Sequence, residues 1–110
     1  MSEQQYSIVM QTPIGKKYGS LSVSILEDKL NGCLTLLNHN EPIEGTVDGN
    51  GNCSFTGKLV TLLRTIPFVA TGIISDSEVK LQIKGARNTF RLTGVIDEKG
   101  KDWKEWGSFI

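Results

Sequence analysis

The residues of this chain that could carry chemistry are few and scattered. His39 is its only histidine, and it lies in a polar stretch that also contains Glu41 and Glu44. A histidine beside a serine or cysteine makes a nucleophile–base pair, and two carboxylates can divide acid–base work. The two glutamates flank a turn at Pro42 and Ile43, however, where acidic side chains commonly serve solubility. We therefore predict no catalytic residue and a protein that is not an enzyme.

The two cysteines give no stronger signal. Cys33 and Cys53 lie far apart and have no supporting histidine, which makes them a poor set of metal ligands. The sequence contains no phosphate-binding loop, dinucleotide fingerprint, nucleophile elbow or Cys-x-x-Cys motif. We predict neither a metal site nor a cofactor, and we expect both thiols to be reduced on their strands in the cytosol.

The charges balance over the whole chain. The chain has twelve basic and twelve acidic residues. Positions 1–55 contain three basic and six acidic residues, and positions 56–110 contain nine basic and six acidic residues. A balanced chain has no overall field to attract nucleic acid or an anionic membrane, so neither is predicted as a partner.

The cellular location follows from what the sequence does not show. The first residues, Met1–Gln5, have neither the basic nor the apolar segment of a signal peptide. The apolar run Leu59–Ala70 is interrupted by Arg64 and Pro67 and is too short to span a bilayer. We expect a soluble protein in the cytoplasm.

The elements that would position any site are short strands. In the clearest one, Tyr18–Leu26, apolar Leu21, Val23 and Ile25 alternate with serines, and Gly49-Asn50-Gly51 is a strong hairpin signal. A polar loop, Asn38–Pro42, is expected before one of the strands. The other strands are placed at Glu3–Thr12, Leu30–Asn38, Ile43–Asp48, Asn52–Gly57, Lys58–Ile66 (continuous with the previous one or kinked from it), Phe68–Ile74, Glu78–Lys84 and Thr89–Ile96.

This pattern predicts an all-β fold: an antiparallel meander of about eight strands closing into a small β-barrel, with a short aromatic C-terminal segment. Residues 1–97 would form the barrel and residues 98–110 an appendage. The interior of such a barrel is filled by side chains or holds one small ligand. The side chains expected to point inward are Ile8, Met10, Leu21, Val23, Ile25, Leu34, Leu36, Val47, Phe55, Leu59, Val79, Leu81, Ile83, Phe90 and Leu92.

Two alternatives stand for that interior. It is either a packed core or a cavity for a small apolar ligand, which would be lined by Leu21, Val23, Leu81, Ile83 and Phe90. The packed core is the simpler of the two, because no polar group is predicted inside to orient a ligand.

A second candidate site is a surface. The stretch Leu59–Ile66 is apolar on both faces, so something should cover its outer face. The cover is either the chain's own aromatic tail or a second subunit in a homodimer. The predicted interaction surface consists of Val60, Leu62, Trp103, Trp106 and Phe109.

Four phrases carry a resemblance to a known group: Thr12-Pro13-Ile14-Gly15, Lys29-Leu30-Asn31-Gly32, Gly45-Thr46-Val47-Asp48-Gly49 and Phe90-Arg91-Leu92-Thr93-Gly94. With them the chain resembles a small, poorly characterised β-barrel domain of prokaryotes, calycin-like and lipocalin-type in its layout. The resemblance covers residues 6–96 and implies the fold. It implies no catalytic residue, because the shared motifs are turns and strands.

Together these observations predict a small soluble, non-enzymatic binding or interaction module that can self-associate. The alternative is a carrier of a small apolar ligand in the barrel lumen. An enzyme of unknown reaction comes third.

Overall fold

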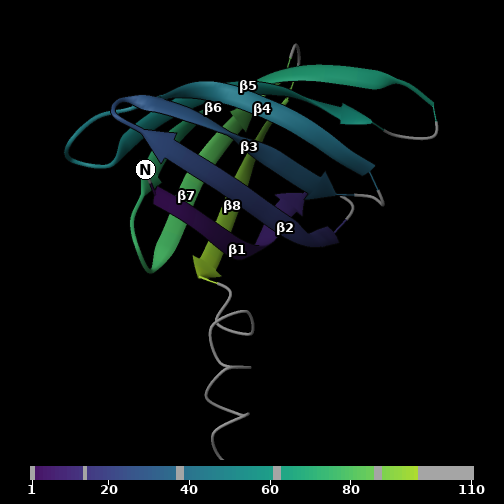
Figure 1. Ribbon diagram of the computed structural model, residues 1–110. Helices are drawn as coiled ribbons and strands as arrows, with labels where there is room; N and C mark the ends of the chain where they lie inside the picture. The colour runs from purple at the N-terminus through teal and green to yellow at the C-terminus, as the bar shows by residue number, and fades with distance from the viewer. Residues whose placement is uncertain (1, 14, 37–38, 61–62, 86–87, 97–110) are drawn as a thin grey trace, which may run out of the picture.

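The computed structural model describes residues 2–13, 15–36, 39–60, 63–85 and 88–96. Each strand pairs antiparallel with the next, and the last pairs with the first, which gives a closed barrel (Figure 1). The predicted all-β meander closing into a barrel is confirmed. The described residues include no helix long and apolar enough to cross a membrane. The strands are β1 (Ser2–Thr12), β2 (Gly15–Leu26), β3 (Lys29–Leu36), β4 (His39–Val47), β5 (Asn52–Val60), β6 (Thr65–Ile74), β7 (Glu78–Lys84) and β8 (Thr89–Ile96).

The barrel closes between its first and last strands. β1 residues Tyr6–Gln11 pair with β8 residues Arg91–Ile96. Closure joins the two strands that would otherwise be the edges of the sheet, where unpaired backbone groups favour aggregation.

The interior is a single hydrophobic core. Every side chain predicted to point inward is buried except Ile25 and Phe90, which are partly buried and pack against the core. The alternation of inward and outward side chains along each strand accounts for this agreement. The core also contains residues that the prediction omitted, namely Tyr6, Leu30, Ile43, Cys53, Phe68, Ala70 and Ile74.

Two predicted segments are wrong. The proposed strand Lys58–Ile66 does not exist, because β5 ends at Val60 and β6 begins at Thr65, so the chain reverses direction between them. The apolar sequence continues through this hairpin and hides it, and Leu63 in the connection is 93% exposed. The loop expected before Ile43 is also too long, since β4 begins at His39 and pairs with β3 from there on.

Glycines allow the strands to bend sharply enough for closure. A Cβ on Gly45 would lie 1.9 Å from the carbonyl oxygen of Ser54, and one on Gly72 would lie 2.0 Å from that of Lys80. No other residue type permits such a close approach between neighbouring backbones.

Candidate functional site

A groove lies on the side of the barrel. The groove has a volume of about 870 Å³ and crosses β4, β5 and β6. Asn31 and Gly32 of β3 lie at one margin, and Lys84 and Gly85 lie at the other. A volume of this size lies in the range of pockets that hold small organic ligands. The groove lies where the pairing between two neighbouring strands stops.

The β4–β5 pairing is short. Only Glu44–Val47 of β4 pair with Cys53–Thr56 of β5. β4 extends back to His39 and β5 extends forward to Val60, so both strands continue beyond their common ladder. The barrel is therefore split along this part of its wall.

A proline accounts for the split. The Asp48 N–H donates to the Asn52 carbonyl at 3.0 Å. The even-numbered residues of β4 therefore direct their backbone N–H and C=O groups toward β5. Because hydrogen-bonded pairs recur at every second residue, the next pair beyond Glu44 would join Pro42 and Lys58. Proline has no N–H to donate, so the ladder ends there.

The opposite side of β4 agrees with this parity. The Val47 N–H donates to the Asp28 carbonyl at 2.9 Å, so the odd-numbered residues of β4 direct their backbone groups toward β3. Pro42 is even-numbered, and its pairing with Cys33 on β3 therefore requires no donor from it. The proline is tolerated because it faces the open side.

A second proline lies just beyond the end of the β6–β7 ladder, which is also where β7 itself ends at Lys84. The Ser75 N–H donates to the Glu78 carbonyl at 2.9 Å, and the same two-residue alternation leads along β6 to Val69, where pairing with β7 stops. The next donor position on that side of β6 is Pro67. Thus β5 and β6 pair with each other beyond the points where each stops pairing with its outer neighbour.

The outcome is a two-stranded ribbon, formed by Gly57–Val60 and Thr65–Phe68. Among the described residues it has no ladder to β4 or to β7. Figure 1 shows this end of the β5–β6 hairpin reaching beyond the ends of the neighbouring strands. The ribbon forms one wall of the groove.

The floor of the groove consists of core side chains. A Cβ on Gly57 would lie 2.9 Å from Ile43 Cγ2 and 2.9 Å from Phe68 Cζ, so these two side chains occupy the space beneath this glycine. Both are buried, and the Phe68 ring packs edge-to-face on Phe55 with centroids 6.4 Å apart. Because both are almost fully buried, the apolar side chains of the groove that a ligand could contact are the exposed Pro42, Pro67 and Val69.

The rim of the groove is charged. Lys58, Lys84 and Glu44 are exposed there, and Glu41 is half-buried at the split. Rim groups of both signs can orient a polar end of a ligand, while the apolar floor supplies affinity. The described residues that line the groove include no nucleophile beside a base.

A second hollow of about 500 Å³ lies at the end of the barrel where the Glu27, Asp48 and Asp76 turns meet. Tyr6 closes the core beneath it. Its hydroxyl lies 2.7 Å from Gln4 Oε1 and also hydrogen bonds to the Ser75 carbonyl. Burial, followed by the charges of Asp76 and Cys53, raises the pKa of Tyr6 to about 12.

The residues first considered for chemistry do not assemble. His39 is exposed at the start of β4, Cys33 is half-buried on β3, and Cys53 is buried in the core. Burial, with a smaller effect from Asp48, raises the pKa of the Cys53 thiol to about 11, which keeps it protonated and unreactive. The described residues contain no group of three or more His, Cys, Asp or Glu side chains able to hold a metal ion.

The predicted lumen residues do come together. Leu21, Val23, Leu81 and Ile83 are all buried in one continuous core, and Phe90 packs against it. The two hollows described above are lined by other residues.

Of the predicted interaction surface, Val60 is half-buried at the end of β5. Leu62, Trp103, Trp106 and Phe109 lie outside the described residues, as does the whole appendage 98–110.

Sequence reasoning missed the groove because it treated Pro42 and Pro67 as loop markers. The available signal was a proline flanked by strand-like alternation, which indicates a position whose N–H faces no partner. What the sequence could not supply was the register that sets both prolines on the open sides of their strands.

Comparison with known proteins supports the fold class. No protein-family model and no curated protein matches the chain. Among solved structures, it is similar to a redesigned β-barrel, mFAP1, bound to DFHBI, with 14% sequence identity and a TM-score of 0.53 over 86% of this chain and 92% of that one. It is also similar to a de novo designed fluorescence-activating β-barrel, with 10% identity and a TM-score of 0.48 over 84% and 89%. At these identities the likeness concerns the fold alone: a small closed antiparallel barrel of eight strands.

Proposed function

We propose that this protein is a non-enzymatic binding protein that holds a small, largely apolar ligand in the groove between β4 and β5. One observation carries the proposal. Where Pro42 ends the ladder, the barrel wall opens over the buried side chains of Ile43 and Phe68, beneath a groove of about 870 Å³. The apolar surface that stays accessible in this groove comes from the exposed side chains of Pro42, Pro67 and Val69, and such surface in a concave site favours an apolar ligand.

One further point favours the groove over the lumen, and a second supports small-molecule binding in general. The predicted lumen residues form a continuous core, and filling of an eight-stranded barrel by side chains is common. A barrel of this fold, mFAP1, is bound to the small molecule DFHBI, which supports small-molecule binding as a use of the architecture. The sequence-based alternative is a carrier that holds a small apolar ligand in the lumen. The ligand proposed for this chain is of the same kind, but it lies in the groove instead.

The test is a titration with Nile red, a neutral dye whose fluorescence rises in apolar surroundings. Val69→Trp fills the groove from its β6 side, since Val69 lines the groove and is 44% exposed. Ile73→Trp is the matched control on the same face of the same strand, 55% exposed and outside the groove. We expect saturable binding that Val69→Trp weakens by about tenfold or more and that Ile73→Trp leaves within about twofold, tenfold being about 1.4 kcal/mol.

Two results would count against the proposal. Absence of saturable binding removes the site, and equal loss in both variants indicates dye on the general surface. Binding that survives Val69→Trp but is lost in Leu81→Trp would return the ligand to the lumen, provided that circular dichroism shows the latter variant to be folded.

Self-association, the absence of catalysis, the cytoplasmic location and the resemblance to prokaryotic calycin-like domains stay predictions. Native mass spectrometry of the full chain distinguishes a homodimer from a monomer and reports any retained ligand in the same spectrum. Full retention of any detected activity in His39→Ala would exclude a reaction centred on the only histidine.

A further inference from the structure

The charges of the barrel are separated along its axis. Because each strand runs antiparallel to the next, successive turns lie at alternate ends of the barrel. Residues that are distant in the sequence therefore gather at each end. We call the end that carries the β5–β6 tip the basic end, and the other the acidic end. The basic end carries Lys16, Lys17, Lys58, Arg64, Lys84 and Arg91, and the acidic end carries Glu3, Glu27, Asp28, Asp48, Asp76 and Glu78.

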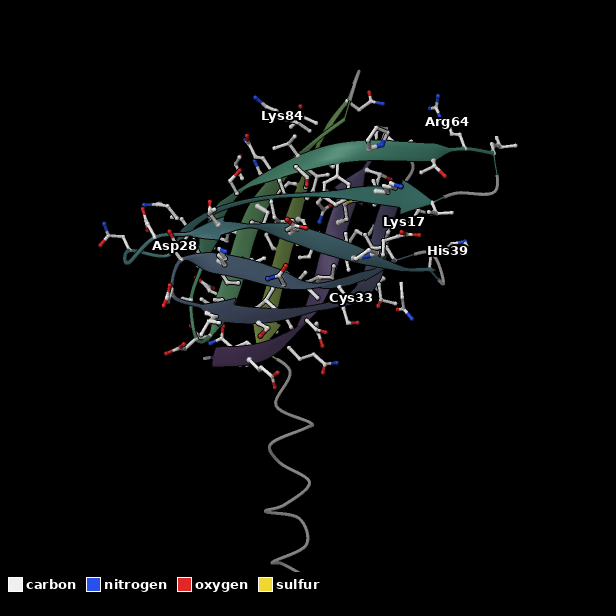
Figure 2. The ribbon with its side chains drawn as sticks, turned by 45° about the horizontal axis from the view of Figure 1, so that its top comes forward. Lys17, Asp28, Cys33, His39, Arg64 and Lys84 are labelled. Carbon is white, nitrogen blue, oxygen red and sulfur yellow. The ribbon has the colours of Figure 1, made fainter. Side chains whose placement is uncertain are left out.

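Figure 2 labels residues of both ends: Lys17 and Arg64 lie on the side of the β5–β6 tip, Lys84 lies at the top of the view, and Asp28 lies on the opposite side. The exceptions among the described residues are few. Glu41 lies toward the basic end, Glu44 lies midway along β4 on the rim of the groove, and Lys29 and Lys80 lie toward the acidic end. Although the total charge of the chain is zero, the charges of the described residues are therefore unevenly distributed along the barrel axis.

The basic end also presents apolar side chains to solvent. Leu63, beside Arg64 in the connection that ends the ribbon, is 93% exposed, and Tyr18 near the start of β2 is 70% exposed. An aliphatic side chain at the tip of a projecting hairpin can enter the boundary between headgroups and acyl chains without any change in the fold. Basic residues around it would meet anionic headgroups.

We infer that the basic end docks on the surface of an anionic lipid bilayer, with Leu63 entering the interface and the lysines and arginines contacting headgroups. The prediction of no membrane partner used the balanced total charge, which is insensitive to how the charges are arranged. A bilayer fits better than a nucleic acid, because single strands are held by stacking on exposed aromatic rings and this end offers only Tyr18 among its described aromatic side chains. The inference is independent of any ligand in the groove.

The acidic end supplies matched controls for both parts of the inference. Leu26 is an exposed leucine at that end, 56% exposed, and Lys29 and Lys80 are exposed lysines toward it. Each basic residue near an anionic surface raises partitioning by about fivefold, and the effect falls off within a Debye length of about 10 Å at 0.1 M salt.

The experiment is co-sedimentation of the full chain with vesicles of phosphatidylcholine, with and without phosphatidylserine. We expect binding only when phosphatidylserine is present, and its loss at about 1 M salt, where the Debye length is about 3 Å. The double variant Lys16→Glu, Lys17→Glu should lower partitioning by about 25-fold or more, while Lys29→Glu, Lys80→Glu should not lower it. Leu63→Ser should lower it by about tenfold and Leu26→Ser by less than about twofold.

Three results would overturn the inference. The first is absence of binding to phosphatidylserine vesicles at low salt. The second is equal loss in the basic-end variants and their acidic-end controls. The third is unchanged vesicle binding in Leu63→Ser together with tighter, lysine-dependent binding to a single-stranded oligonucleotide in fluorescence anisotropy, which would assign the basic end to a nucleic acid instead. Lys17 is half-buried and the other substituted positions are exposed, so circular dichroism is expected to show the native fold in each variant.

Discussion

Replacing Pro42 by valine should close the split in the barrel wall. The substitution supplies the backbone N–H that the next position of the β4–β5 ladder lacks, opposite Lys58. Valine favours strands, and position 42 is exposed, so its side chain meets no core residue. Gly57, between the existing ladder and Lys58, has no side chain to hold the two strands apart.

The magnitude follows from the hydrogen bonds that become available. A restored pair at positions 42 and 58 can make two backbone bonds, each contributing about 1 kcal/mol net. Loss of the proline restores freedom to the unfolded chain and costs about 0.4–1 kcal/mol. The free energy of unfolding should therefore rise by about 1–1.6 kcal/mol, and the Lys58 amide should exchange about 5–15 times more slowly.

Amide hydrogen exchange by NMR measures this directly at Lys58, and urea unfolding gives the global value. Thr46→Val is the control, because Thr46 is a β4 residue that already pairs with Ser54. Closing the split should also weaken Nile red binding to the groove. If the folded Pro42→Val protein keeps a rapidly exchanging Lys58 amide and an unchanged stability, the missing donor is not the cause of the split.

Three further expectations concern the acidic end of the barrel. Glu27→Gly should raise the free energy of unfolding by about 1 kcal/mol in urea, because Glu27 has a φ of 59° and a positive φ strains any residue with a Cβ; Asp28→Gly should not raise it. Tyr6→Phe should lower that free energy by about 1–2 kcal/mol, because the Ser75 carbonyl loses its hydrogen bond, and an unchanged value would show that water replaces the hydroxyl. The free energy of unfolding should fall as the pH rises from about 9 to about 12. The ordinary pKa values of Cys53 and Tyr6 are 9.0 and 10.0, and folding raises them to about 11 and about 12. The unfolded chain therefore releases these protons at lower pH than the folded chain, which favours unfolding. Thermal unfolding across this range should show a smaller fall in Tyr6→Phe, and an equal fall in both proteins would contradict the assignment to Tyr6.

Local patterns in the sequence are sufficient for the class of fold. Alternation along segments such as Leu21, Val23 and Ile25 sets which side chains point inward, because successive residues of a strand face opposite sides. Polar turns such as Glu27-Asp28 and Asp48–Gly51 mark where the chain reverses, and Asp48 accepts backbone hydrogen bonds from Asn50 and Asn52 within its own turn. These signals depend on near neighbours in the chain and can be recognised without the tertiary structure.

The hairpin between Val60 and Thr65 could not be recognised in this way. Its residues continue the apolar run of the strands on either side. Leu63 has an apolar side chain, as core residues do, although it is almost fully exposed. Whether an apolar residue lies in a strand or at a hairpin tip depends on the register with a partner strand, which is a long-range property.

The sequence alone determined a closed eight-stranded barrel and most of its core, because strand periodicity and turn chemistry are local. Only the tertiary structure decided the candidate sites. Register sets Pro42 at the next hydrogen-bonding position beyond Glu44, where the β4–β5 ladder ends and the groove opens. The alternation of the strands between the two ends turns a balanced set of charges into a basic and an acidic end. Both features arise from pairings between residues that are distant in the chain, which neither composition nor spacing can report.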